Sequence, residues 1–304
     1  MKNKGFTLTE VAMVLVVVAV LVGGLMGPMF RYIDQQRFTA TQAQLTNVRE
    51  ALVAYAAANG RLPCPAYHTA ATNSGGIEVI GAANGCGSAT MPLGTVANNT
   101  GAWVGFVPAR TLGLSPLDQD GFLLDAWGNR LRYAVVNRLP AATSGRYSNT
   151  NSSPFNTQTD NLFTGKGQMC QDYLPVVPGA SEKKWNAVAN YLALDYTPGA
   201  TNKGMLHVCR GVPPGAMAGL RCGTPLGSTP STNTETDSAP AVVYSVGQQA
   251  VSRGADEAEN LNLDRIFVNH PPSEVATNRF DDLVAWVSLN TLYAKMLSAG
   301  QLCP

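Results

Sequence analysis

Few side chains in this 304-residue sequence have the types and spacing that catalysis needs. Three histidines are present, far apart and outside any His-Glu-x-x-His pattern: His68, His207 and His270. Ser181 and Lys184 match Ser-x-x-Lys, but the companion motifs of that chemistry are missing, so Ser181 reads better as a helix start. We therefore predict no enzyme and no catalytic residue, and an anchored hydrolase would need an unrecognised site.

Acidic residues between positions 118 and 125 suggest a metal ion. Asp118, Asp120 and Asp125 surround Gly121, and calcium prefers several carboxylate and carbonyl oxygens around a sharp turn. The spacing is not that of the twelve-residue calcium loop, and aspartates are common in solvated turns. A calcium ion and a plain solvated turn both stay open, and no other cofactor is expected.

Other acidic and aromatic groups are interpreted as structural. The acidic run around position 257 is expected to face water, and the acidic pair before position 283 to form a turn or an interaction edge, with the turn favoured. Tryptophans lie more often in cores and interfaces than in ligand sites. The residues concerned are Asp256, Glu257, Glu259, Asp281, Asp282, Trp103, Trp127, Trp185 and Trp286.

Cysteine usage predicts disulfides. The chain has six cysteines, none in a Cys-x-x-Cys pair, which argues against a zinc ribbon or a thioredoxin-like site. An even count after an export segment is typical of an oxidising compartment such as the periplasm. Six cysteines allow 15 pairings. The pairings that we favour are Cys64 with Cys86 and Cys209 with Cys222, which are close in sequence, and Cys170 with Cys303, which follows by elimination.

One carboxylate lies directly before a long apolar run. Residues 11–30 are uncharged, and as a helix they would be about 30 Å long, which matches the hydrocarbon thickness of a bilayer. Glu10 directly precedes this run, and a carboxylate at that depth usually marks a function. The simpler alternative is that Glu10 snorkels to the lipid headgroups.

The residues before Glu10 argue against that alternative. Lys2, Lys4 and Gly5 are followed by Phe6-Thr7-Leu8-Thr9-Glu10, and the pattern Gly-Phe-Thr-Leu-x-Glu resembles the N-terminus of type IV prepilins and type II secretion pseudopilins. The resemblance implies cleavage after Gly5 by prepilin peptidase, methylation of Phe6, and pairing of Glu10 with the N-terminus of a neighbouring subunit. A plain signal peptide or a single-pass anchor is the alternative. Major pseudopilins of this family also bind calcium in a head loop.

Two further segments are similar to large pilin-like proteins. The stretch "DGFLLDAWGNRLRYAV", residues 120–135, resembles an Asp-x-Trp-Gly-Asn segment of pseudopilin heads, and "FDDLVAWVSLNTLYAKMLSAGQLCP" resembles their C-terminal ends. They add family resemblance rather than mechanism.

Charge and composition limit the partners. The formal net charge is +1, which argues against general nucleic-acid binding because that needs a basic face. Lys2 and Lys4 favour a cytoplasmic N-terminus, although Arg31 and Arg37 weaken the bias. The resemblance implies a location in the bacterial inner membrane, as a single-pass protein with its head in the periplasm, and then in a pilus or pseudopilus.

The predicted fold is α+β and pilin-like, with a long N-terminal helix on an antiparallel sheet that carries large loop insertions. Phe38, Leu45, Val48, Leu52 and Tyr55 share one helical face, and Asn59-Gly60 is a stop signal. Gly23, Gly24, Gly27 and Pro28 indicate either a flexible point or a helix end. The predicted strands are Trp103–Val107, Arg130–Val136, Met205–Val208, Ala241–Val246, Arg265–Val268 and Leu283–Val287. Further helices are expected at Ser181–Tyr191 and Leu289–Ala299, and loops at Ala141–Gln158 and Pro213–Pro240.

The sequence thus predicts four segments: a leader (1–5), a membrane and filament-core helix (6–30), an amphipathic helix (31–59) and a periplasmic or extracellular head (60–304). The expected function is that of a structural subunit, a minor pilin or pseudopilin. Its expected partners are prepilin peptidase, other pilin-like subunits and the inner-membrane assembly machinery. The alternative is a membrane-tethered binding module or adhesin that does not assemble.

Overall fold

The structure is a computed structural model. It describes residues 7–67, 75–80, 86, 102–136, 206–211, 220–222, 224–225, 232–249, 254–262, 265–273, 275 and 279–301. Within these ranges the backbone alone is described at residues 22–31, 102–103, 220–221 and 224–225. The predicted helix at Ser181–Tyr191 and the predicted loop at Ala141–Gln158 lie outside the described residues.

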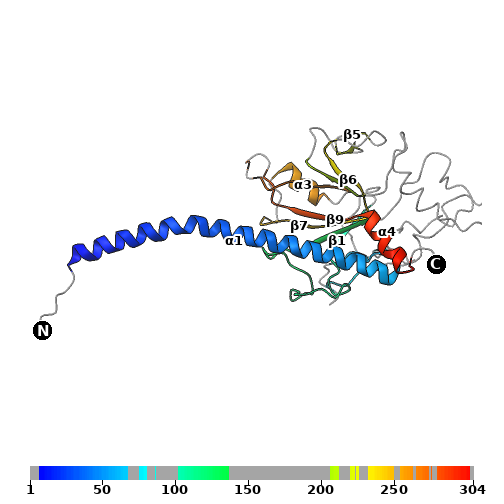
Figure 1. The fold of residues 1–304 in the computed structure, drawn as a ribbon, viewed down its shortest axis with the longest axis horizontal. Helices are drawn as coiled ribbons and strands as arrows, with labels where there is room; N and C mark the ends of the chain where they lie inside the picture. The colour runs from blue at the N-terminus through cyan, green and yellow to red at the C-terminus, as the bar shows by residue number, and fades with distance from the viewer. Residues whose placement is uncertain are drawn as a thin grey trace, which may run out of the picture.

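Helix α1 (Leu8–Asn59) is the longest element among the described residues. It begins at the N-cap Thr7 and ends at Gly60, whose φ of 72° is the left-handed conformation that glycine adopts without strain. Its 52 residues give a length of roughly 80 Å. The helix continues through Pro28, so the predicted alternative of a helix end there is wrong, whereas the flexible point stays a prediction. Figure 1 shows the first part of α1 extending away from the head and the last part lying along it.

The main sheet has four antiparallel strands in the order β1-β2-β7-β9. They are β1 (Ala102–Phe106), β2 (Arg132–Val136), β7 (Ala241–Ser245) and β9 (Leu283–Val287). In the register, Tyr133 of β2 lies opposite Gly105 on one side and Val243 on the other. Each strand was predicted within one or two residues of its ends, because runs of β-branched and aromatic residues are a local signal.

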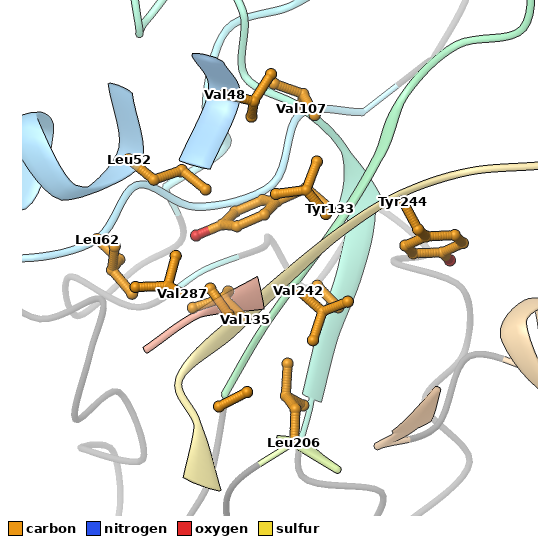
Figure 2. Packing of buried hydrophobic residues seen from close by; sticks show 14 of the residues in the cluster. Val48, Leu52, Leu62, Val107, Tyr133, Val135, Leu206, Val242, Tyr244 and Val287 are labelled. Atoms are coloured by element: carbon orange, nitrogen blue, oxygen red, sulfur yellow. The ribbon is translucent and has the colours of Figure 1, made fainter. Parts of the chain in front are cut away.

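The core lies between this sheet and the last part of α1. Leu45, Val48 and Leu52 of α1 are almost fully buried, as the predicted stripe requires. Figure 2 shows Val48 and Leu52 beside Tyr133 of β2. Helix α4 (Leu289–Ser298) follows β9 and contacts α1, completing this layer. We call residues 38–56 of α1 the docked half.

A second sheet contains β6 (Thr234–Ala239), β3 (Leu206–Cys209) and β8 (Ile266–Val268) in the order β6-β3-β8. Strands β3 and β6 are antiparallel, but β3 and β8 are parallel. The predicted α+β class, with a long N-terminal helix on an antiparallel sheet, is therefore confirmed, whereas the expectation of a single sheet is wrong. Only Pro240 separates the end of β6 from the start of β7, so one continuous chain segment connects the two sheets.

The stretch from Pro213 to Pro240 was predicted as a loop, and this is also wrong where the structure describes it. It holds β6 and the short pair β4 (Leu220–Arg221) and β5 (Thr224–Pro225). Strand β6 reads Thr-Glu-Thr-Asp-Ser-Ala and lies at a sheet edge, where most of its residues are half-exposed. A half-exposed edge strand does not need the apolar alternation that reveals a strand in a sequence.

The short helix α3 (Ala255–Leu261) packs on β8. Its acidic residues Asp256, Glu257 and Glu259 are buried, with at most 9% of their surface exposed. The prediction that this acidic run faces water is therefore wrong. The run is buried because α3 lies against β8 and against the segment directly before β9.

Candidate assembly site at the N-terminus

The first part of α1 exposes apolar side chains on all sides. Between residues 8 and 21, the exposed fractions of ten large apolar side chains range from 48% to 88%. They are Leu8, Val11, Met13, Val14, Leu15, Val16, Val17, Val18, Val20 and Leu21. We call residues 8–21 the apolar arm. A helix that is apolar all round is normally buried in a large core or a membrane, so the arm has the composition of a buried helix without partners in this chain's described residues.

Within the described part of the chain, no helix is both long enough and apolar enough to cross a membrane.

Glu10 is the single charged residue of the apolar arm, and Thr7 holds it at the helix start. The amide N–H of Thr7 donates to Glu10 Oε2 at 2.9 Å, and the Thr7 hydroxyl donates to the same oxygen at 2.8 Å. In return, the amide N–H of Glu10 donates to Thr7 Oγ1 at 3.3 Å. This reciprocal capping box satisfies N–H groups that a helix N-terminus leaves open, and it fixes the position of the carboxylate.

The role of Thr7 was missed in the sequence, although the signal was present. Thr7-Leu8-Thr9-Glu10 fits the pattern Thr-x-x-Glu before an apolar run, which predicts a capping box. The other predicted processing residues, Gly5 and Phe6, lie outside the described residues. By sequence they directly precede Thr7, so the predicted cleavage point is two residues from the cap.

The Asp-x-Trp-Gly-Asn segment forms a joint between α1 and the main sheet. Asp125 is buried and accepts hydrogen bonds from the Ser245 hydroxyl at 2.6 Å and from the amide N–H of Asn129 at 2.8 Å. The side-chain amide of Asn129 donates to the carbonyl of Gly247 at 2.7 Å. Thr41 of α1 accepts from the amide N–H of Ala126 at 3.1 Å. These contacts connect the loop after β1 to α1 and to the end of β7.

The three candidate calcium ligands are not brought together. Asp118 accepts from Arg130 Nε at 2.8 Å, and Asp120 pairs with the same guanidinium group. Burial opposes ionisation of Asp118, but the amide N–H of Phe122 and the Arg130 guanidinium lower its pKa. Asp125 belongs to the separate network with Ser245. A cation at this loop would compete with the guanidinium group of Arg130 for these carboxylates. Calcium binding stays a prediction that nothing here tests.

A different group of carboxylates does converge in the head. One carboxylate oxygen from each of Glu257, Asp281 and Asp282 lies within 4.8 Å of the other two. We call these residues the carboxylate cluster. Asp282 is buried, so the predicted turn at Asp281-Asp282 is in fact a packed junction directly before β9.

The predicted histidines and Ser-x-x-Lys residues form no catalytic group among the described residues. His207 is buried in β3, and His270 pairs with Asp256 of α3 at 3.0 Å. His68, Ser181, Lys184 and Trp185 lie outside the described residues.

Two of the predicted disulfides are present. Cys64 is bonded to Cys86 and Cys209 to Cys222, with Cα–Cα distances of 5.2 Å and 5.4 Å. Cys170 and Cys303 lie outside the described residues, so their pairing stays a prediction. The described disulfides agree with an oxidising compartment.

An ion pair missed in the sequence fastens the end of α1 to the head. The carboxylate of Glu78 accepts from Arg61 Nη1 and Nη2 at 2.7 Å each, from the Tyr55 hydroxyl at 2.7 Å and from the amide N–H of Cys64 at 3.0 Å. Burial raises the pKa of Glu78, but its hydrogen bonds to Arg61, Tyr55 and Cys64 outweigh burial and lower the pKa overall. Arg61 and Glu78 are 17 residues apart, too far for a local pattern to reveal.

Comparison with known proteins adds one finding. Residues 1–26 match the family model described as the prokaryotic N-terminal methylation motif. No curated protein and no solved structure matches the chain. The motif supports the type IV prepilin and pseudopilin family, whose members are structural, and it implies a pilin-like substrate of prepilin peptidase that is anchored in a membrane.

Proposed function

Starting from the methylation motif at residues 1–26, we propose that this chain is a minor pilin or pseudopilin, a structural subunit of a type IV pilus or a type II secretion pseudopilus. Prepilin peptidase cuts after Gly5, the new N-terminus at Phe6 is methylated, and the mature chain joins a filament. The observation that carries this proposal is the apolar arm, an exposed apolar helix segment that begins near a fixed carboxylate and lies within the matched residues 1–26.

The apolar arm needs two successive environments in this proposal. Before assembly, the uncharged run at residues 11–30 lies in the inner membrane with the head in the periplasm. After assembly, the same side chains pack against other pilin-like subunits in the filament core. Both environments remove the arm from water, which accounts for apolar residues on every side of the helix.

Glu10 selects the neighbour. Cleavage creates a positive α-amino group on Phe6, which is as unfavourable in an apolar core as a carboxylate. Both hydrogen bonds from Thr7 end on Oε2 of Glu10, which leaves Oε1 for the α-amino group of an adjacent subunit. Pairing the two charges offsets part of both desolvation penalties and sets the register of the subunits.

The size of the head supports a minor or tip position rather than a major one. The head spans residues 60–304, and its described part already contains a four-stranded and a three-stranded sheet, more than a repeated building block needs. In this proposal residues 1–5 are the leader, 6–30 the membrane and filament-core helix, 31–59 the amphipathic helix and 60–304 the head.

The test is the variant Gly5→Leu, with Asn3→Leu as the matched control. A large side chain at Gly5 should obstruct the peptidase at the cleaved bond, while the same side chain two residues earlier should not. The measurement is the intact mass of the chain and its presence in sheared filament fractions. Mature mass from Gly5→Leu contradicts the proposal. A wild-type chain that keeps residues 1–5 and stays out of filaments favours the tethered binding module instead.

A further inference from the structure

The ring of His270, two residues after β8, lies at the meeting point of three chain segments. Its Nε2 is 3.0 Å from Asp256 Oδ2 in the first turn of α3, and its Nδ1 is 2.8 Å from the carbonyl oxygen of Pro271. The ring stacks on Phe280 of the segment before β9, with ring centroids 3.9 Å apart and planes inclined by 27°. One imidazole ring therefore joins α3, the segment after β8 and the segment before β9.

The chemistry of these contacts specifies how many protons the ring needs. A carbonyl oxygen can only accept a hydrogen bond, and the same is true of an ionised carboxylate. A neutral imidazole has one N–H and donates once, whereas an imidazolium has two and donates at both nitrogens. The contacts of His270 with an ionised Asp256 and with Pro271 are therefore satisfied together only when the ring is an imidazolium.

Two further observations favour a cation at this position. Asp256 is 4% exposed, and a buried carboxylate is unfavourable unless a cation or hydrogen-bond donors compensate it. The face of an aromatic ring attracts a cation, and the Phe280 ring is stacked on the His270 ring. The imidazolium thus meets a carboxylate at one nitrogen and an aromatic face across its plane.

We propose that His270 is a pH-sensitive clamp: as an imidazolium it holds α3 to the segment after β8, and as a neutral ring it gives up one of its two hydrogen bonds. The clamp goes beyond the proposed function, because it does not depend on cleavage or on filament assembly.

The clamp controls how firmly α3 covers β8, an edge strand among the described strands of the second sheet. The Asn260 side-chain N–H donates to the Val268 carbonyl at 3.0 Å, and the Asn260 side-chain oxygen accepts from the Val268 amide N–H at 2.7 Å. These two bonds take the place of a neighbouring strand. Loosening of α3 therefore uncovers backbone groups at the edge of this sheet.

The direction of the pH dependence follows from linkage. The closed head offers two acceptors that only a protonated ring can satisfy together, so closure of α3 and protonation of His270 favour each other. The stabilisation is present at low pH and is lost as the pH rises through the range of about pH 5 to 8 in which histidines change charge. Loss of one hydrogen bond to a charged group should increase the equilibrium constant for opening α3 by about 10- to 100-fold.

Other charged groups on the surrounding elements must be separated from this ring. They are Glu257 and Glu259 of α3, Arg279, Asp281 and Asp282 on either side of Phe280, and Glu235 of β6 with its partner Arg210. Burial raises the pKa of Asp282 to about 7, so this carboxyl group titrates in the same range, and its stabilisation is likewise lost as the pH rises. Its contact with α3 is the hydrogen bond from Asn260 at 2.8 Å.

The first measurement follows the protonation of the ring itself. The chain has three histidines, so selective ¹⁵N-histidine labelling of the full chain in detergent micelles gives few signals, and His270→Gln assigns those of residue 270. We expect both ring nitrogens of His270 to carry protons at every pH at which α3 is fully protected. A ring that is neutral while α3 is fully protected means that Asp256 donates the shared proton, and this overturns the proposal.

The second measurement is amide hydrogen exchange on the same sample from pH 4.5 to 8.5, corrected for the intrinsic pH dependence of exchange. Protection of residues 255–261 and of Val268 should fall by about 10- to 100-fold over the pH range in which His270 loses its proton. Amides of α4 are the internal control and should show no such step. A flat profile across the titration of His270 overturns the proposal.

Substitutions assign the step. In Asp256→Asn a neutral ring can accept from the new side-chain amide and donate to Pro271, so both contacts persist without a charge and the step should vanish. If Asp256→Asn fails to fold, His270→Gln provides the same test, because its protection should be low and independent of pH. The matched controls Asp282→Asn and Glu235→Gln should keep the step. A step that is lost in Asp282→Asn but kept in His270→Gln belongs to Asp282 and overturns the proposal.

Discussion

The two parts of α1 belong to one continuous helix but have opposite surroundings. In the docked half, Leu45, Val48 and Leu52 are buried against the main sheet, and the remaining faces carry polar residues. In the apolar arm every face is apolar, and the large apolar side chains are exposed. The docked half therefore finds its partners within the chain, whereas the arm has the composition of a helix whose partners are other molecules.

This difference separates two kinds of stability. Burial in the docked half contributes to the free energy of unfolding of the head. Burial of the apolar arm contributes to membrane insertion and subunit association, and leaves the fold of an isolated head unaffected. Substitutions in the two parts should therefore have effects that do not mix.

The largest effect is expected for Glu10→Val in assembly. The variant makes the arm more apolar, so insertion and cleavage should persist. In a filament, the α-amino group of a neighbouring Phe6 would be buried without a partner, at a cost of about 3–5 kcal/mol. Incorporation should then fall by roughly 10²- to 4 × 10³-fold.

The measurement is the ratio of cleaved chain in the membrane to chain in filaments or in cross-links with other pilin-like subunits. Glu10→Gln is the matched control: it keeps the capping box and loses the charge, so it should also fail to assemble. If both variants assemble normally, Glu10 is an ordinary interfacial residue. A subunit at the very tip has no neighbour above it and would tolerate the loss.

The next effect is expected in the docked half. Leu52 is fully buried, and Leu52→Ala should lower the free energy of unfolding of the head by about 2–5 kcal/mol, since it removes buried methyl groups and leaves a cavity. Leu15→Ala makes the same change at a side chain that is 63% exposed, and should leave head unfolding unchanged. Chemical denaturation in detergent micelles, followed by tryptophan fluorescence, checks both. Equal destabilisation by the two variants would contradict the separation.

The disulfide in the second sheet should act on the head alone. Replacing Cys209 and Cys222 together by alanine opens a loop of 13 residues, which should lower the free energy of unfolding by about 3 kcal/mol. Cleavage after Gly5 should not change, because both cysteines of this bridge lie in the head and not in the apolar arm. Melting curves and intact mass measure the two quantities, and an unshifted melting temperature would refute a stabilising role for the bond.

Much of the fold could be predicted because its signals are local. The strand at Leu283–Val287 and the helix end at Asn59 follow from short runs of a few residues. The two described disulfides join cysteines 13 and 22 residues apart, the pairs that proximity favours. The arm was likewise visible, because one glutamate before twenty uncharged residues is a strong contrast.

The rest depends on partners that are distant in sequence. The polar strand β6 shows no periodicity because it lies at an edge, and the parallel pairing of β3 with β8 has no local signal. The acidic helix α3 reads as exposed, and its burial depends on Asp282, which follows Asn260 by 22 residues. The Arg61–Glu78 pair was invisible for the same reason.

The smallest effect concerns that pair and tests where the docked half ends. The Tyr55 hydroxyl donates to Glu78, and burial together with this hydrogen bond raises the pKa of Tyr55 to about 12, so the phenol stays protonated at neutral pH. Tyr55→Phe keeps the ring and removes one hydrogen bond to a carboxylate, which should lower the free energy of unfolding of the head by about 1–2 kcal/mol at pH 7.

The effect of Tyr55→Phe should depend on pH. Since the pKa of Glu78 is lowered in the folded head, the stabilisation by the Glu78 carboxylate is present above its ordinary pKa of 4.5 and is lost as the pH falls below that value. The difference between wild type and Tyr55→Phe should therefore shrink as the pH falls through this range. Tyr32→Phe, at a tyrosine that is 62% exposed on the same helix, is the matched control and should show no difference at any pH. A pH-independent loss in Tyr55→Phe would assign the effect to packing of the ring rather than to the bond with Glu78.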